Sequence, residues 1–330
     1  MQTLHLAILL TTPFAVDKVQ DAEPVQRAIE RSLDFLDKDA VAWVKKQKCA
    51  TCHHVPMMVW ALNEAKHHGY RINEKSLAEV MEWALVANNH KSIFPDLPLD
   101  KHKSETDFLG PLNLALALKA VRQPDAAQTA ARQRLLTHAA TRQEADGSWN
   151  ANSGGRPPVH GTPYAMTAWF LLALPDAGGS GADPFKNQRD KAAAWLNQAK
   201  LPNDTHALLL RLLVFERLEP KSSERQKIRE RVLRRQNADG GWQQEDGMGS
   251  DAFATGLAMY VLTQSPSNEM REPLLRARDF LVKTQQADGS WLMKSRPAPP
   301  PGPGPARYLT PIRYWGSAWA TIGLVQPLPK

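Results

Sequence analysis

The sequence predicts an all-α protein whose helices form two concentric layers, and three observations lead to this prediction. Three segments are near copies of one another. The steps between their tryptophans, 93 and 49 residues, correspond to about two units and one unit of a 45–50-residue repeat. Between the copies, amphipathic and nearly uniform apolar helical patterns alternate. A period of this size is typical of stacked supersecondary units.

The three copies share a glutamine, two further positions, an aspartate, a glycine, a small residue and a tryptophan. They occupy residues 143–149, 236–242 and 285–291. Aspartate and glycine favour turns, the glycine because it adopts backbone angles that other residues avoid. We therefore interpret the aspartates as turn residues and the tryptophans as packing residues, not as catalytic groups.

Each copy lies between two kinds of helical pattern. An amphipathic run such as 277–283 precedes the motif, and an apolar run follows it after a loop. An amphipathic helix is exposed on one side, whereas a uniformly apolar helix is enclosed on most sides. The apolar runs lie at 55–62, 111–118, 167–174, 206–213, 255–262 and 317–324. Six inner helices surrounded by six outer ones close on themselves, which predicts one domain over residues 21–330.

The motif Q-x-x-D-G-S-W followed by an apolar helix resembles the repeat of squalene–hopene cyclases, a superfamily shared with protein prenyltransferase β subunits. The resemblance covers about residues 25–327 and implies an (α/α)6 toroid, two concentric rings of six helices. Cyclases of this kind protonate an alkene with the middle Asp of a D-x-D-D motif, which this sequence lacks. The prenyltransferase zinc site uses Asp, Cys and His from separate repeats. Asp251 and His160 could supply two of these ligands, but no cysteine lies in the matching later repeat.

The only two cysteines of the chain lie in the segment 49–53, which reads C-A-T-C-H. This spacing attaches a c-type haem through two thioethers, with the following histidine as an iron ligand. We therefore expect covalent haem c on Cys49 and Cys52, with His53 as the proximal ligand. The opposite ligand would come from another unit, and His160 is one candidate. Zinc, a redox dithiol and a strained disulfide remain alternatives.

The haem interpretation has a consequence for the N-terminus. Covalent haem attachment belongs outside the reducing cytosol, so we expect a periplasmic or otherwise exported protein. Residues 4–10 are apolar, and residues 1–20 are a possible export signal or a disordered tail. The stretch is short, however, and lacks the basic start of a secretory signal.

The net charge of +7 favours anionic partners. Lys and Arg residues are scattered and form no basic block, which argues against nucleic acid. An anionic membrane surface or an acidic redox partner protein fits this distribution better.

The inner helices of such a toroid would begin around a central cavity. Aligning the six apolar runs places Asp107, Tyr164, Asp251 and Tyr314 close to the starts of four of them. These four are the candidate catalytic residues, and the C-x-x-C-H segment stands at the start of the first run. His53 and His160 are the candidate metal ligands.

Together these features predict an exported c-type haem protein that transfers electrons or oxidises a small molecule, such as an isoprenoid, in the central cavity. The alternative is a haem-free terpene cyclase or prenyltransferase-like enzyme that acts on a polyprenyl substrate through acids such as Asp107 and Asp251. A second alternative is a non-catalytic scaffold held by a zinc or disulfide clip.

Overall fold

Helices make up almost all of the regular structure in this computed structural model. It describes residues 23–48, 50, 53–86, 89, 109–150, 158–159, 162–175, 183–264, 267–294, 296 and 305–329. Within these residues there are twelve helices and one pair of two-residue strands. No helix in that part of the chain has the length and apolar character needed to cross a bilayer.

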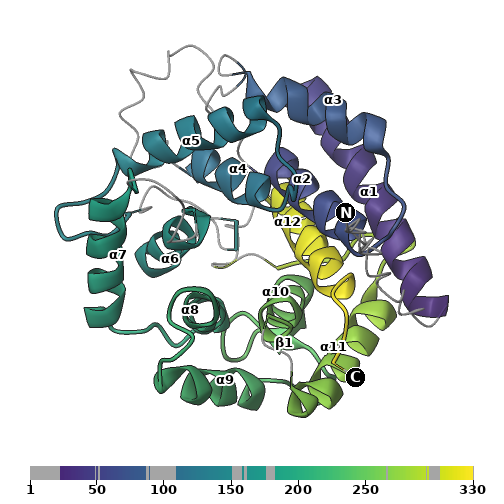
Figure 1. Cartoon of the computed structure of the whole chain (residues 1–330). Coiled ribbons are helices and arrows are strands. Elements are labelled where there is room, and N and C mark those ends of the chain that lie inside the picture. Colours follow the sequence, from purple (N-terminus) through teal and green to yellow (C-terminus); the bar gives the residue numbers. More distant parts are fainter. Residues whose placement is uncertain are drawn as a thin grey trace, which may run out of the picture.

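The helices form two concentric rings (Figure 1). The inner ring consists of α2 (His54–His67), α4 (Leu109–Lys119), α6 (Pro163–Ala173), α8 (Thr205–Leu218), α10 (Ala252–Leu262) and α12 (Pro305–Leu324). The outer ring consists of α1 (Glu23–Gln47), α3 (Glu74–Leu85), α5 (Ala126–Ala140), α7 (Lys186–Gln198), α9 (Glu224–Arg234) and α11 (Asn268–Thr284). This arrangement confirms the predicted all-α fold class, an (α/α)6 toroid.

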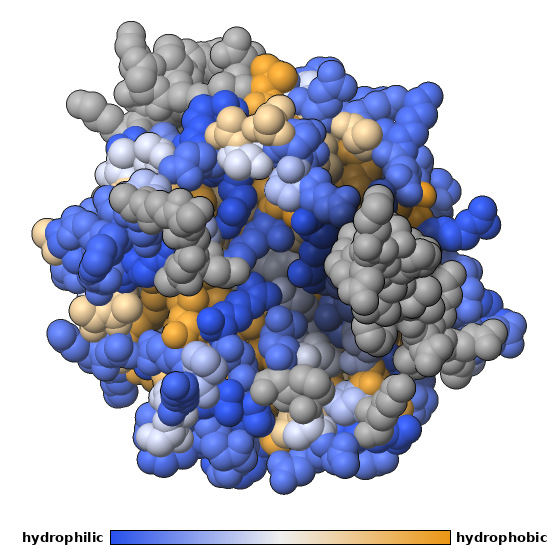
Figure 2. Space-filling model, viewed as in Figure 1, coloured by the Kyte–Doolittle hydropathy of each residue, from blue (hydrophilic) through white to orange (hydrophobic). Residues whose placement is uncertain are grey.

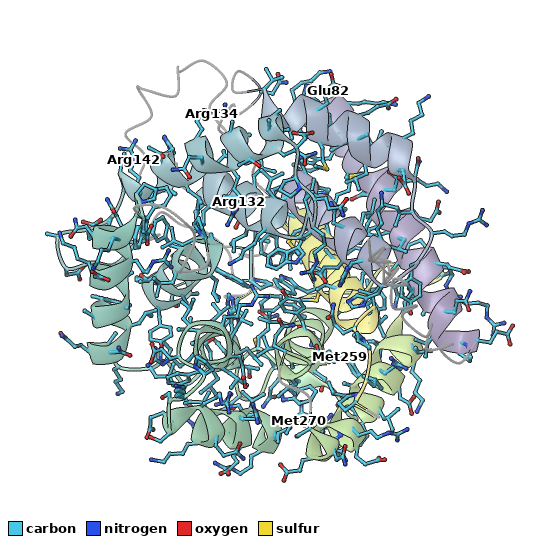
Figure 3. All side chains as sticks on the ribbon, in the orientation of Figure 1. Glu82, Arg132, Arg134, Arg142, Met259 and Met270 are labelled. Atoms are coloured by element: carbon cyan, nitrogen blue, oxygen red, sulfur yellow. The ribbon has the colours of Figure 1, made fainter. Side chains whose placement is uncertain are left out.

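Burial distinguishes the two rings as the sequence patterns predict. Every residue of α10 is buried, whereas α7 buries Ala192 and Leu196, which lie one turn apart on one face. In Figure 3, Glu82 and Arg134 lie at the outer rim, while the fully buried Met259 lies inside it. The apolar inner helices therefore form the core, and the outer helices cover it.

The inner helices all run in the same direction, because one outer helix leads back between each of them and the next. Their first residues therefore gather at one end of the ring, which we call the N-terminal end, marked by Thr205 and Ala252. Their last residues gather at the opposite, C-terminal end, marked by Lys119, Leu218 and Leu262.

The ring closes where the end of the chain meets its beginning. Helix α12 packs between α10 and α2, and α11 lies beside α1. Two glycines allow α10 and α12 to approach closely: a Cβ on Gly256 would lie 2.2 Å from the Trp319 carbonyl oxygen, and one on Gly323 would lie 2.6 Å from the Gly256 carbonyl oxygen.

The repeated motifs tie consecutive outer helices together. In the third copy, Gln285 Nε2 donates to the Gly289 carbonyl at 3.0 Å and to the Ala28 carbonyl of α1 at 2.8 Å. The Trp291 indole N–H donates to the Leu281 carbonyl at 2.9 Å, near the end of α11. The first two copies make the same kind of bonds, from Gln143 to the Gln188 carbonyl and from Gln236 to the Pro273 carbonyl.

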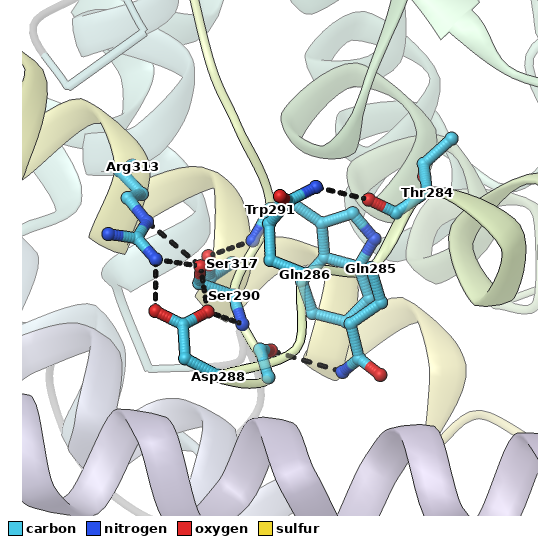
Figure 4. Close-up of polar contacts among 9 residues, drawn as sticks. Thr284, Gln285, Gln286, Asp288, Ser290, Trp291, Arg313 and Ser317 are labelled. Atoms are coloured by element: carbon cyan, nitrogen blue, oxygen red, sulfur yellow. Dashed lines mark hydrogen bonds and ion pairs between the residues drawn. The ribbon is translucent and has the colours of Figure 1, made fainter.

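The aspartate of the motif organises the turn. Asp288 Oδ1 accepts hydrogen bonds from the Ser290 backbone N–H and hydroxyl, and Arg313 pairs with its other oxygen (Figure 4). Trp291 is buried and its own backbone N–H donates to the Ser317 hydroxyl at 3.0 Å. These contacts agree with the interpretation of the motif as turn and packing residues.

The glycine of the motif leads to a prediction: Gly240→Ala should destabilise the protein more than Gly247→Ala. Both glycines have positive φ, +90° and +85°, so alanine costs a similar backbone strain of about 1 kcal/mol at either site. A Cβ at Gly240 would lie 2.4 Å from the Arg276 carbonyl oxygen of α11, whereas nothing lies within 4 Å at Gly247. We expect this clash to add about 1–3 kcal/mol to the loss. Urea unfolding of both variants measures it, and equal losses would contradict the packing described.

Helix α12 begins well before the apolar run that predicted it. The run 317–324 is the C-terminal part of this helix, which starts at Pro305. Tyr314 therefore lies inside a helix and not in the loop that precedes one.

Candidate functional site

Aromatic side chains from several inner helices meet at the centre of the ring. The ring centroids of Trp60 (α2) and Trp319 (α12) are 5.1 Å apart, and those of Trp169 (α6) and Tyr260 (α10) lie 5.8 Å from that of Trp319. Phe253 and His206 extend the group toward the N-terminal end, with 5.1 Å between their centroids. We call these six residues the aromatic cluster.

Asp251 lies at the N-terminal end, directly before α10. It follows the second motif, and the strands β1 (Trp242–Gln243) and β2 (Ser250–Asp251) place it opposite Trp242. Aspartate is a favoured residue at a helix N-cap. Its Oδ1 accepts the Ala254 backbone N–H at 2.9 Å. Its Oδ2 is buried and has no hydrogen-bond partner among the described residues, although the residue as a whole keeps some exposure.

The surroundings of Asp251 favour its neutral form. Burial raises the pKa of its carboxyl to about 6, because the charged form loses hydration. The backbone N–H groups of Ala254 and Phe253, the Gln244 amide and the Arg296 charge oppose this rise in pKa. Asp251 is therefore a carboxylic acid that remains partly protonated close to neutral pH.

His206 is the second residue of the neighbouring inner helix α8 and belongs to the same end of the ring. Its Nε2 is buried and has no hydrogen-bond partner among the described residues. Burial lowers its pKa to about 3, and the charge of Arg296 acts in the same direction. The imidazole is therefore neutral at physiological pH.

Arg296 also lies at the N-terminal end of the ring, which the sequence did not indicate. Its Nε donates to the Gln244 side-chain oxygen at 2.9 Å, and its Nη1 lies 2.5 Å from a Glu245 carboxylate oxygen. It follows the third motif in a link between helices, and no local pattern marks it. The contact joins residues about fifty positions apart, so only the folded chain reveals it.

The two predicted catalytic tyrosines contact outer helices. Tyr164 stands in the first turn of α6 with its ring 6.2 Å from that of Trp195 on α7, and burial raises its pKa to about 12. Tyr314 is buried in α12, where its hydroxyl donates to the Leu36 carbonyl of α1 at 2.9 Å. Burial also raises the pKa of Tyr314 well above its usual value. Asp107 and His160 lie outside the described residues.

At the start of α2, side chains from α1 and α12 pack around the histidines. The His54 ring stacks between Trp43 and Tyr314, with centroids 4.2 and 4.0 Å away. His54 Nε2 lies 3.1 Å from an Asp39 carboxylate oxygen, and burial lowers the pKa of this imidazole. The buried His53 ring lies 4.7 Å from Trp43, and its Nδ1 contacts Nδ1 of His54. Cys49 and Cys52 lie outside the described residues.

The other side of the aromatic cluster faces a cavity at the C-terminal end, with a volume of about 380 Å³. Trp60 and Tyr260 belong both to the cluster and to the cavity wall. On the face seen in Figure 2, hydrophilic side chains surround a hollow near the centre of the ring.

Comparisons with known proteins found a type II terpene cyclase of similar fold and a synthase of partly similar sequence. The solved apo structure of the type II terpene cyclase MstE from Scytonema superposes with a TM-score of 0.56, covering 92% of this chain and 98% of that one at 12% identity. The drimenyl diphosphate synthase of Streptomyces showdoensis is 28% identical over an alignment of 195 residues, which covers 47% of this chain. The match spans 36% of that synthase, little more than a third of its length. No known protein-family profile matches the chain.

These findings correct the prediction of a c-type haem on Cys49, Cys52 and His53, which is wrong. The matched proteins are a type II terpene cyclase and a drimenyl diphosphate synthase, which favours the haem-free alternative. Within the described residues, no group of three or more His, Cys, Asp or Glu side chains is placed to hold a metal ion. The His53 ring lies against those of Trp43 and His54, with ring centroids 4.7 and 4.6 Å away.

The same correction applies to the electron-transfer function, to the redox partner that it required and to the zinc alternative. Export, the role of residues 1–20 and contact with an anionic membrane surface stay predictions. The chain has a terpene cyclase-like fold.

Proposed function

We propose that this protein is a haem-free terpene cyclase that binds an isoprenoid chain against the aromatic cluster and starts cyclisation by protonating it with Asp251. The observation that carries the proposal is the buried Asp251 Oδ2, which lacks a hydrogen-bond partner among the described residues. It lies at the start of α10, whose first turn contributes Phe253 to the aromatic cluster. The terpene cyclase-like fold supports the same reaction class.

The arrangement of the Asp251 carboxyl suits a proton donor. Its Oδ1 is held by the Ala254 backbone N–H, which leaves Oδ2 to carry the proton. A pKa of about 6 keeps a useful fraction of the acid protonated near neutral pH, which is the range where general acids work best. The family motif D-x-D-D is absent, so this chemistry would depend on a single aspartate.

The reaction that follows needs a surface that tolerates positive charge. Protonation of a terminal alkene carbon leaves a carbocation, which a second alkene of the same chain attacks to form a ring. Aromatic faces attract cations through their quadrupoles, and Trp does so most strongly. The neutral His206 adds no repelling charge at the end where the cation forms. Loss of a proton from a neighbouring carbon then ends the reaction, so that the product is an isomer of the substrate.

A panel of linear isoprenoids tests this proposal. Purified protein is incubated with polyprenyl diphosphates, polyprenols and a polyprenyl hydrocarbon of several lengths, and products are separated by gas chromatography with mass detection after dephosphorylation. We expect at least one substrate to give a cyclic isomer. Failure of folded protein to convert any of them, or conversion to linear alcohols alone, would contradict the proposal.

A further inference from the structure

Two buried polar side chains at the N-terminal end of the ring act on the Asp251 carboxyl. Gln244 is fully buried, and Arg296 is 9% exposed. Gln244 directly follows strand β1, in which Trp242 pairs with Asp251, and Arg296 comes from the link after the third motif. Burial of polar groups costs free energy unless they find partners. The partners of these two residues therefore explain what holds them at this end.

Three contacts fix Gln244 in place. Its backbone carbonyl accepts the Thr205 backbone N–H at 3.0 Å, at the start of α8. Its side-chain Oε1 accepts the Arg296 Nε–H at 2.9 Å, and its Nε2 lies 3.5 Å from the Lys294 carbonyl oxygen. A side-chain amide has one end that accepts and one end that donates, whereas a guanidinium only donates. Because Arg296 occupies the oxygen, the NH2 group is the end that remains for other acceptors.

The orientation of this amide affects the acid. The Gln244 side chain lowers the pKa of Asp251, which is the effect of an N–H group directed at a carboxylate. Oδ2 of Asp251 nevertheless has no hydrogen-bond partner among the described residues, so the amide leaves this oxygen free to hold the proton. A reversed amide would present its oxygen to the carboxyl and favour the protonated form. The contact with Arg296 selects the first of these two orientations.

Arg296 also acts through its charge. That charge lowers the pKa of Asp251 and, on α8, the pKa of His206. The guanidinium is itself paired, because its Nη1 lies 2.5 Å from a carboxylate oxygen of Glu245, whose side chain is 53% exposed. The carboxylate offsets part of the positive charge at the end of the ring where the carbocation would form.

Other ionisable groups of the described residues also lie at this end. Asp239 Oδ1 accepts the Ser250 hydroxyl at 2.7 Å, Asp204 caps α8, and Arg235 pairs with Asp246 at 3.3 Å. Of the charged groups at this end, Arg296 is the one that shifts the pKa of Asp251.

We propose that Arg296 is a positioning residue for the acid: it fixes the Gln244 amide with its NH2 group toward the Asp251 carboxyl and so sets the strength of this acid. The catalytic use of the acid rests on the proposed function, whereas the effect of Arg296 on the titration of Asp251 does not. A stronger acid protonates an alkene faster, but it keeps its proton over a narrower pH range. Arg296 therefore raises the rate and narrows the pH range.

A purely structural role would explain the same contacts in another way. Arg296 joins the link after the third motif to the loop after the second, so its removal would loosen this end of the ring. Under that explanation, replacing Arg296 lowers stability and reduces kcat by the same factor at every pH. A change in the pH dependence separates the two explanations.

The titration of Asp251 tests the inference without turnover. The free energy of unfolding in urea is measured against pH for each protein with and without Asp251→Asn, and the difference isolates this carboxyl. A higher pKa in the folded state extends to higher pH the window in which the free energy of unfolding falls. We expect Arg296→Met to raise the upper limit of that window by at least about 0.5 pH unit. Glu245→Gln, which leaves the Arg296 charge unpaired, should lower it.

Three variants make this measurement specific. Glu245 is exposed, so Glu245→Gln provides the test even if Arg296→Met does not fold. Arg296→Lys keeps the charge but lacks the rigid set of donors that reaches Gln244 and Glu245 together, so it should shift the window less than Arg296→Met. Arg235→Met is the matched control. Arg235 is 13% exposed at the same end and donates to the Asn203 carbonyl at 2.7 Å, so its loss should destabilise the protein without moving the window.

The pH profile of kcat gives a second readout. On the low-pH plateau, where the acid is protonated in both proteins, Arg296→Met should be about 2- to 10-fold slower than the wild type. Its falling limb should lie at higher pH, so the difference in rate should narrow as pH rises. An equal loss at every pH, an unchanged titration window in Arg296→Met, or the same shift in Arg235→Met would overturn the inference.

Failure of this inference can be told apart from failure of the proposed function. A shifted Asp251 titration in a protein that cyclises no substrate would count against the proposed function alone. Cyclisation that Asp251→Asn abolishes, with the same pH profile in the wild type and in Arg296→Met, would count against this inference alone.

Discussion

Replacing Asp251 with asparagine is expected to lower kcat for cyclisation by at least about 10²-fold while the protein stays folded. Asparagine is as good an N-cap as aspartate, so it preserves the hydrogen bond to the Ala254 backbone N–H. Its amide group cannot supply the proton that the buried Oδ2 would deliver. Turnover measured alongside circular dichroism separates loss of the acid from loss of structure.

Asp204→Asn is the matched control for this variant. Asp204 caps the neighbouring inner helix α8 at the same end of the ring, and its Oδ1 accepts the Ala207 backbone N–H at 2.8 Å. We expect this variant to keep close to full activity. Similar losses in both variants would show that the capping geometry matters and that Asp251 is not the acid.

The raised pKa of Asp251 makes the stability of the wild type depend on pH, and Asp251→Asn tests this dependence. Between its ordinary value near 4 and about 6, the folded protein holds a proton that the unfolded chain has lost. The free energy of unfolding therefore falls as pH rises through this window. Above pH 6 the whole of this loss of stability is present. Asp251→Asn should remove that slope and be at least as stable as the wild type at pH 8. The kcat of the wild type should fall as pH rises above 6.

Trp291→Ala is expected to lower the free energy of unfolding by about 3–5 kcal/mol, the typical cost of removing a large buried aromatic side chain. Trp291 is 1% exposed, and its indole N–H is bonded to the Leu281 carbonyl at the end of α11. The motif to which it belongs also joins α11 to α1 through Gln285 and the Ala28 carbonyl. The substitution therefore weakens the place where the last outer helix meets the first.

Urea unfolding measures this loss, and the next residue offers the control. Leu292 is 69% exposed, so Leu292→Ala should change the free energy of unfolding by no more than about 0.5 kcal/mol. A loss below about 1 kcal/mol for Trp291→Ala would contradict the account of ring closure.

The architecture could be predicted from the sequence because each repeat unit shows its helix types and its turn in a short stretch of residues. The three motifs and the alternation of helix types required no knowledge of distant contacts. The start of α12 could not be predicted in the same way, because Pro305 and Pro311 both lie within this helix. Proline is common at the first position of a helix, but within a helix it usually causes a break. The sequence before Ser317 therefore did not predict a helix.

The candidate site was less accessible to sequence reasoning. Asp251 could be singled out because it follows a motif and precedes an apolar run. Its raised pKa depends on burial within the folded ring, which outweighs the opposing effects of Gln244 and of Arg296 from another repeat, and no local pattern shows this. The C-x-x-C-H spacing was misleading because it is a local pattern, and a local pattern does not show which side chains pack around it in the folded chain. Of the residues around its histidine, Trp43 on α1 packs against the rings of His53 and His54, and Asp39 lies beside His54.

The central claim is that a proton from Asp251 starts the cyclisation of an isoprenoid chain. The mass of the cyclic product made in deuterium oxide tests it most directly. The wild type should incorporate one solvent deuteron into each product molecule at the alkene end of the chain, and Asp251→Asn should make almost no such product. A cyclic product without solvent deuterium, or one formed equally well by Asp251→Asn, would contradict the account.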